Sequence, residues 1–359
     1  MKPPQAHHFI PAAHLARFSA SPTNVGPRDR LLHLYDKRSG RFRSGKVGKL
    51  GFENDLYTFR MPDLRGVEPE LEQLYNAAFD PANKDAGLET DKIDIETNGL
   101  AAMEAVEGWC VGQRQLSEDE RAPLLAYVGL LLAQHPTTMG ARAAALRDRF
   151  WEAASFRGSP PPQLRAVFDE AMRGAAVLAV VPDGLATALE LNYLAWKVIR
   201  WRDAPRLILG DVGVAAWYPG TVWGVGDPWT PDAKFLLPVS PTTVVILGGL
   251  GPGLCVVEDR TGVDAAKEVG VINVGSWARS RAEVYAADRS DLERTMSLLG
   301  PIDPRAHQSA QLPVRETALP AFEVDAQGDL KINQPPEPHG DDTQQRFDAR
   351  FKTVDSTRH

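Results

Sequence analysis

Two adjacent histidines near the start of the chain, His7 and His8, are the residues best suited to chemistry. The imidazole group titrates closest to neutral pH and is also a common metal ligand. Because alternate residues of an extended strand face opposite sides, at most one of the two enters a site directly unless the backbone turns. Three roles fit this pair: a hydrogen-bonded histidine in a packed N-terminus, a general acid or base (or a phosphate contact), and a metal ligand.

Metal binding is the least supported of these roles. His14 and His33 could add nitrogen ligands, but no pair of histidines has the H-x-x-x-H spacing of a helical zinc site, and no Cys/His cluster is present. We therefore name no metal ligand and no cofactor.

Three further polar residues, Gln134, Asp211 and Glu96, lie in or beside apolar elements. Gln134 ends a long apolar segment, and Asp211 follows a predicted strand, where site groups are often placed. Each also has a structural explanation, a buried hydrogen bond for Gln134 and an Asx-turn for Asp211. Together with one of the two N-terminal histidines, we predict that they form the polar centre of a site.

The segment that begins at Ser117 is predicted to be the central helix. Glu120 follows three residues later, which is the spacing of a capping box, in which each side chain binds the other residue's backbone amide. Residues 124–133 are apolar on nearly every face, as is typical of a helix buried all round. Helical periodicity also predicts helices over residues 13–18, 69–79, 93–109, 141–156 and 163–172.

Segments with strand character occupy both ends of the folded part. A hairpin is predicted from residue 31, with its turn at 37–40, and further strands over 196–201, 206–209, 235–238, 242–247 and 254–257. The order predicts an α+β fold: a β-like N-terminal unit, an inserted helical region with a central buried helix, and a β-rich C-terminal half. We expect a single domain over residues 5–290 and a Pro-rich, largely disordered tail at 301–359, with one small hairpin at 322–332.

The charge is distributed unevenly along the chain. Residues 1–65 hold 12 Lys/Arg against 5 Asp/Glu, whereas residues 66–120 hold 3 Lys/Arg against 14 Asp/Glu. The two segments could neutralise each other within the fold. Alternatively, the basic hairpin is an exposed patch that could bind a nucleic acid or nucleotide, above all through Arg41, Arg43 and Lys46. Its basic residues are Lys37, Arg38, Arg41, Arg43, Lys46 and Lys49. A sequence pI of about 5.7 argues against bulk binding to duplex DNA.

Absent motifs exclude several common enzyme classes. The chain has no Gly-x-Ser-x-Gly elbow, Rossmann fingerprint, Walker loop or kinase signature. The glycine-rich segment 248–253 lacks a following Lys-Ser/Thr and precedes another strand, which favours a hairpin loop. The first eight residues are polar and no apolar run approaches the about 18 residues of a membrane span, so we expect a cytoplasmic protein with no membrane partner.

The chain resembles a known family, the bacterial domain of unknown function numbered 4238. The resemblance covers most of residues 5–290, and its most specific part is the His-His-x-x-Pro start. It departs from the family pattern at two places. His135 stands where an arginine is usual, and Gly210-Asp211-Val212-Gly213 stands where Ser-Asp-x-Pro is usual. The motifs that carry it include His7-His8-Phe9-Ile10-Pro11, Asn54-Asp55-Leu56-Tyr57, Ile95-Glu96, Ser117-Glu118-Asp119-Glu120, Ala133-Gln134 and Gly210-Asp211. The family name implies kinship and no activity.

Two functional hypotheses follow. The first is a hydrolase acting on a phosphodiester, nuclease-like, with His7 or His8 as general acid or base, Asp211 or Glu96 as its orienter and Gln134 as a polar stabiliser. The second is a binding or effector protein without catalysis, in which the basic hairpin docks an acidic partner. Proximity of His8, Gln134 and Asp211 in the fold would favour the first.

Overall fold

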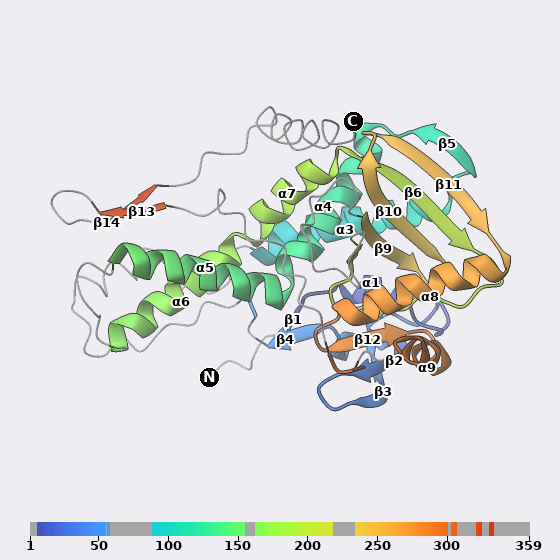
Figure 1. Cartoon of the computed structure of the whole chain (residues 1–359), viewed down its shortest axis with the longest axis horizontal. Coiled ribbons are helices and arrows are strands. Elements are labelled where there is room, and N and C mark those ends of the chain that lie inside the picture. The colour runs from blue at the N-terminus through green and yellow to red at the C-terminus, as the bar shows by residue number, and fades with distance from the viewer. Residues whose placement is uncertain are drawn as a thin grey trace.

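A computed structural model describes residues 6–54, 56–57, 88–154, 162–217, 234–300, 303–306, 321–324 and 330–333 of the chain. Two larger sheets and the helices that cover them confirm the predicted α+β class (Figure 1). The predicted helix at 69–79, residues 66–87 of the acidic segment and most of the predicted disordered tail lie outside the described residues.

The larger sheet has the strand order β5-β11-β6-β10-β9-β8 among the described strands. Strand β11 runs parallel to β6, and the other pairs are antiparallel. The hairpin expected at the glycine-rich segment is wrong, because β10 and β11 do not pair with each other but flank β6. The strands are β5 (Gly112–Gln115), β6 (Leu194–Trp201), β8 (Ala215–Trp217), β9 (Lys234–Ser240), β10 (Thr243–Leu250) and β11 (Leu254–Arg260).

The smaller sheet joins the two ends of the folded part. Its order is β3-β2-β12-β7, so that the N-terminal hairpin pairs with a strand from the C-terminal half. The helical region therefore lies, in the sequence, between strands that pair in this sheet. The bounds are β2 (Leu31–Asp36), β3 (Arg41–Lys46), β7 (Leu209–Gly210) and β12 (Glu283–Ala286), and a separate ladder pairs β1 (Ala6–His8) with β4 (Phe52–Asn54).

The helical region begins with the predicted capping box. Glu120 N–H donates to Ser117 Oγ (3.3 Å), and Ser117 N–H donates to Glu120 Oε2 (2.9 Å). Pro136 is the first residue of the next helix, where its missing N–H has no cost. The helices are α1 (Ala12–Arg17), α3 (Leu88–Glu107), α4 (Glu118–Gln134), α5 (Pro136–Ala154), α6 (Pro162–Leu178), α7 (Val180–Leu191), α8 (Gly262–Arg279) and α9 (Arg289–Leu298).

The core is arranged in layers. Helices α3, α4 and α7 pack on one face of the larger sheet, and α8 packs between its other face and the smaller sheet (Figure 1). Helices α4 and α7 cross closely at two glycines, since a Cβ on Gly129 would lie 2.0 Å from the carbonyl oxygen of Gly184. Every described residue of α4 from Tyr127 to Gln134 is buried, which confirms that it is the central helix.

The described fold continues past the expected domain limit at residue 290. Helix α9 buries Leu292, and residues 303–306 contact the end of α8. The small hairpin predicted near the C-terminus is present as β13 (Ala321–Val324) and β14 (Leu330–Asn333). Among the described residues no single helix has the length and apolar character of a membrane span, although the bent pair 165–178 and 180–191 passes when taken together.

Candidate functional site

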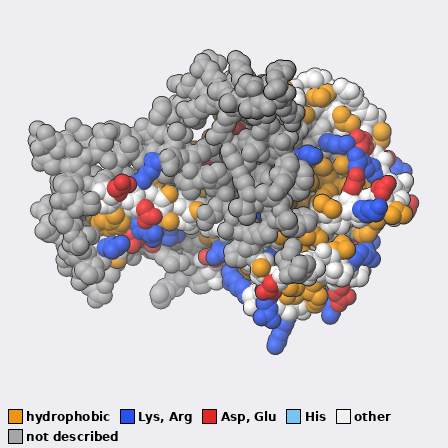
Figure 2. Space-filling model, viewed as in Figure 1, with side chains coloured by type: hydrophobic (Ala, Val, Ile, Leu, Met, Phe, Trp, Pro, Cys, Tyr) orange, Lys and Arg blue, Asp and Glu red, His pale blue; other side chains and the backbone are white. Residues whose placement is uncertain are grey.

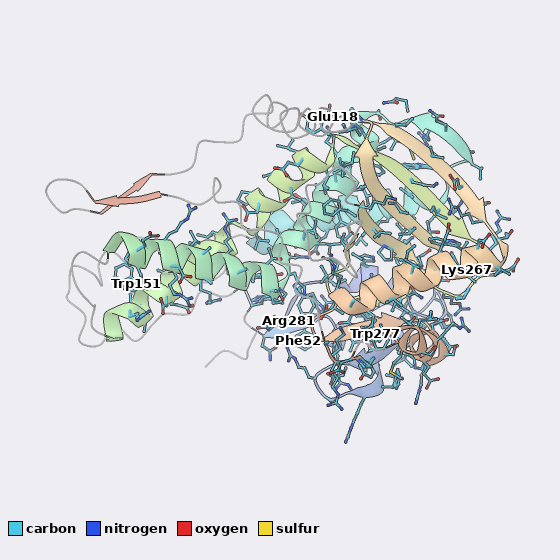
Figure 3. The ribbon with its side chains drawn as sticks, in the orientation of Figure 1. Phe52, Glu118, Trp151, Lys267, Trp277 and Arg281 are labelled. Atoms are coloured by element: carbon cyan, nitrogen blue, oxygen red, sulfur yellow. The ribbon has the colours of Figure 1, made fainter. Side chains whose placement is uncertain are left out.

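Side chains from four separate parts of the chain meet beside strand β1. Pairing with β4 fixes this strand, and its two histidines differ in burial: His7 is 2% exposed, whereas His8 is half-buried. Phe52 of β4 lies at the edge of this region, with its ring centroid 5.7 Å from that of His8 (Figure 3). The groups that meet are the His7 side chain and the His8 backbone carbonyl of β1, Tyr57, Lys92 and Glu96 of α3, and Gln134 of α4; we call these residues the β1 cluster.

The contact made by His7 fixes its protonation state. The backbone N–H of Tyr57 donates to His7 Nδ1 at 3.0 Å. A backbone amide only donates, so Nδ1 carries no proton and the neutral ring holds its proton on Nε2. Protonation of Nδ1 would break this bond. His7 is therefore a hydrogen-bond donor through Nε2 and is poorly suited to be a general base.

Lys92 places a positive charge at the centre of the cluster. Its side chain is 3% exposed, and Nζ lies 3.7 Å from Glu96 Oε1, 3.4 Å from His8 O and 4.2 Å above the Tyr57 ring. Glu96 is 21% exposed and connects this buried charge to the surface. A buried ammonium in contact with a carboxylate, an aromatic face and a carbonyl is held in a fixed place.

Gln134 holds the strand that carries the histidines. Its Nε2 donates to Phe9 O at 2.9 Å, and its own backbone oxygen lies 3.5 Å from the hydroxyl of Tyr57. Gln134 is fully buried, and its Oε1 accepts no hydrogen bond from the described residues. The predicted proximity of Gln134 to the histidine pair is therefore present.

Asp211 lies on the far side of the α4–α5 junction and has a different partner from the expected one. Its Oδ1 is 3.8 Å from His135 Nε2, and no contact with His7 or His8 is described. His135 Nδ1 accepts the Thr137 N–H (3.3 Å), so Nε2 holds the ring proton and faces the carboxylate. The Asp211 carboxylate also accepts three backbone N–H groups, from Arg281 (2.8 Å), Ala282 (2.6 Å) and Glu283 (3.1 Å). It anchors loop 280–283.

A second buried histidine, His14, has no connection to the surface. Its Nε2 donates to Pro238 O and its Nδ1 accepts the hydroxyl of Tyr127, both at 2.9 Å. Burial lowers the pKa of His14 to about 4 and raises that of Tyr127 well above its ordinary value. We call these three residues the His14 centre; it joins α1, α4 and β9. His33, the other histidine considered as a nitrogen donor, bonds to Ser44 on the neighbouring strand.

The basic hairpin is bound to nearby acids. Arg43 lies 3.1 Å from Asp36 and 3.2 Å from Glu283, and Lys46 lies 2.9 Å from Asp29. Arg41 is exposed, and mixed basic and acidic side chains gather at this end of the molecule (Figure 2). Burial raises the pKa of Glu283, so that Arg43 neutralises a carboxylate that is costly to ionise. Within the described residues, local acids compensate part of the basic charge.

Two residues of the β1 cluster, Tyr57 and Lys92, were not predicted. Tyr57 was present only in a motif of the resemblance, and Lys92 lies among acidic residues that indicate an ordinary solvated helix face. Their position results from the packing of α3 against α4, which no local pattern encodes. Within the described part of the chain, no group of three or more His, Cys, Asp or Glu side chains could hold a metal ion.

Comparison with known proteins gives one match. The family model described as "Protein of unknown function (DUF4238)" matches residues 6–247, which confirms the resemblance seen in the sequence and includes the whole β1 cluster as well as Asp211. No curated protein and no solved structure matches the chain.

Proposed function

This chain belongs to the DUF4238 family, whose description names no activity, and from its geometry we propose that it is a hydrolase acting on a phosphodiester, with His8 as general acid and base. The observation that carries the proposal is the β1 cluster, in which a buried lysine from α3 contacts both a partly exposed glutamate and the backbone oxygen of His8, whose side chain is half-buried. Polar groups that converge from distant segments are the usual composition of a catalytic site.

His8 and Lys92 have complementary roles in such a reaction. His8 takes a proton from a water molecule, the water oxygen forms a bond to phosphorus, and the bond from phosphorus to the leaving oxygen breaks. The proton then returns from His8 to that oxygen. Lys92 stabilises the negative charge on the phosphoryl oxygens, and its burial strengthens this effect because little water screens the charge.

The remaining residues of the cluster hold Lys92 and the strand of His8 in position. Glu96 orients Lys92, His7 fixes the backbone at Tyr57, and Gln134 fixes the backbone at Phe9, next to His8. Asp211 keeps a more distant role, since it contacts His135 and loop 280–283. Of the two orienters considered from the sequence, the geometry favours Glu96.

The basic hairpin supplies the proposed contact to substrate phosphates. Arg41 is exposed, and the side chains of Arg43 and Lys46 are 52% and 56% exposed despite their ion pairs. Guanidinium and ammonium groups of this kind bind phosphate oxygens without sequence preference. The same residues could bind phosphates in a binding protein without catalysis. The two hypotheses therefore differ only in whether His8 and Lys92 take part in a reaction.

The test is hydrolysis of bis(4-nitrophenyl) phosphate and of end-labelled single-stranded and duplex DNA and RNA by the full chain. We expect cleavage of at least one of these substrates, lost on His8→Ala and retained on His33→Ala, a matched control at another partly exposed histidine. Removing a general acid or base typically lowers the rate by about 10²–10⁴-fold. Binding of a nucleic acid without turnover would support the binding protein instead, and equal activity of wild type and His8→Ala would exclude His8.

A further inference from the structure

A short C-terminal segment, residues 303–306, is fastened to the fold by contacts from two elements. Lys37 Nζ donates to Ala306 O (2.8 Å), and Trp277 Nε1 donates to Pro304 O (3.0 Å). Asp303 shapes the segment internally, because its Oδ1 accepts the Arg305 N–H (2.9 Å) and its carbonyl accepts the Ala306 N–H (2.9 Å). The segment is thus an ordered strap at the end of α8, where Trp277 lies between that helix and the smaller sheet (Figure 3).

Glycine at position 40 makes room for the strap. Gly40 ends the β2–β3 turn with φ +68°, a conformation that favours glycine. A Cβ at this position would lie 2.6–2.9 Å from the guanidinium group of Arg305. The strap therefore lies against both the turn of the N-terminal hairpin and the end of α8.

Lys37 connects the strap to loop 280–283. Besides Ala306 O, its Nζ donates to Trp277 O (2.6 Å) and Ser280 O (2.7 Å), and its backbone N–H donates to Ala282 O (2.8 Å). This lysine was counted in the basic hairpin from the sequence, yet it is only 2% exposed and all three donors of its ammonium group have backbone carbonyl partners. It is a structural node rather than part of a surface patch.

The loop in turn is held by Asp211. The carboxylate of Asp211 accepts the N–H groups of Arg281, Ala282 and Glu283, and its Oδ1 faces His135 at the α4–α5 junction. Gln134, which positions the strand of His8, is the residue before His135. A continuous series of contacts thus runs from the strap through Lys37 and loop 280–283 to the β1 cluster.

We propose that residues 303–306 form a releasable strap that, while fastened by Lys37 and Trp277, holds loop 280–283 against Asp211 and so lets the C-terminal part of the chain regulate the β1 cluster. The structural part of this proposal stands without the proposed hydrolase activity. The effect on catalysis rests on that activity.

The burial of Lys37 makes the stability of the fastened strap depend on pH. Burial lowers the pKa of its ammonium group to about 8, while the charges of Asp211 and Asp303 act in the opposite direction. A released, solvated lysine titrates near 10.4, so the released state binds more protons than the fastened state between the two values. The fastened state therefore gains stability as the pH rises from about 8 and is weakest below it, at neutral pH.

The experiment combines trypsin cleavage after Arg305 with amide hydrogen exchange on the full-length protein. The variants are Lys37→Met and Trp277→Phe, each of which removes one fastening, and Lys46→Met as a control that removes an exposed lysine of the same hairpin. A synthetic peptide covering residues 300–311 reports the intrinsic trypsin rate. We expect both strap variants to be cleaved after Arg305 at least ten-fold faster than wild type and Lys46→Met, with faster exchange at the amides of residues 281–283.

Several outcomes of this experiment would contradict the proposed strap. Unchanged cleavage after Arg305 in both variants would show that these contacts do not fasten the strap. Faster cleavage with unchanged exchange at 281–283 would show that the strap is not coupled to the loop. If Lys37→Met unfolds, Trp277→Phe, which keeps an aromatic ring in the core, provides the same comparison. If the wild-type protein has no hydrolase activity, only the proposed function is overturned, because trypsin cleavage and amide exchange are measured without substrate.

Discussion

The His14 centre and the β1 cluster are both built around buried histidines, but they differ in the partners of those histidines and in their access to solvent. In the His14 centre both ring nitrogens have a neutral partner, and no side chain of the centre is exposed. In the β1 cluster a buried ammonium group lies among the polar groups, and His8 and Glu96 reach the surface. Hydrogen bonding alone therefore does not distinguish a structural histidine from a candidate catalytic one.

The difference lies in charge and exposure. Burial drives the pKa of His14 to about 4, so that this ring stays neutral at physiological pH and cannot take part in proton transfer. The β1 cluster instead keeps a positive charge, Lys92, whose Nζ lies 3.4 Å from the backbone oxygen of His8, and the side chain of His8 is half-buried. A catalytic histidine must be able to reach water or substrate, and of these two regions only the β1 cluster has a histidine that is not fully buried.

The largest expected effect separates the two regions by activity and stability. His8→Ala should lower the rate of phosphodiester hydrolysis by about 10²–10⁴-fold with little change in melting temperature. His14→Ala should do the reverse, because it leaves Tyr127 without its buried partner and removes a core side chain, at roughly 2–4 kcal/mol. Urea denaturation and initial rates of the same preparations measure both quantities. If both variants lose mainly stability, the β1 cluster is as structural as the His14 centre.

Asp211 provides the next test, since it is buried and its partners are mostly backbone groups. Asp211→Ala would leave three amides of loop 280–283 without an acceptor, and should cost roughly 3 kcal/mol or more of unfolding free energy. Asp211→Asn keeps one acceptor oxygen and should cost less. Equal loss in the two variants would indicate that the charge, through His135, matters more than the loop amides.

A pH titration sharpens the comparison further. The pKa of His14 is about 4 in the folded protein and near 6.5 when unfolded, so the unfolded state binds more protons between these values. The corresponding stability is fully present above pH 6.5 and is lost as the pH falls towards 4, a change of roughly 3 kcal/mol. His14→Gln can make both hydrogen bonds and does not titrate, so urea melts of this variant should show a flatter pH profile. An unchanged profile would assign the acid sensitivity to other groups.

The local structural features could be predicted from the sequence. The capping box at Ser117, the buried helix that follows and the β2–β3 hairpin all depend on short-range spacing, and all are present. The pairing of Gln134 with the N-terminal strand was also anticipated, because a polar residue at the end of a fully apolar helix requires a buried partner.

The errors concern contacts between distant segments. The placement of β6 between β10 and β11 is a property of the whole sheet, and a glycine-rich connection between two strands does not reveal it. Lys37 was assigned to the surface from its charge, although three carbonyl groups from the far end of the chain surround it. Lys92 was missed for the same reason, because burial of a charged residue depends on partners that only the fold supplies.

The smallest expected effect concerns the basic hairpin, whose exposed charges contrast with the two buried histidine regions. Replacing Arg41, Arg43 and Lys46 with glutamine should change the unfolding free energy by less than about 1 kcal/mol, because exposed ion pairs contribute little. It should weaken binding of a labelled single-stranded oligonucleotide and reduce the dependence of that binding on salt, since fewer counterions are released. Fluorescence anisotropy at several salt concentrations measures both. If the triple variant unfolds instead, the ion pairs of Arg43 and Lys46 with Asp36, Glu283 and Asp29 are a structural requirement of the smaller sheet rather than part of a substrate surface.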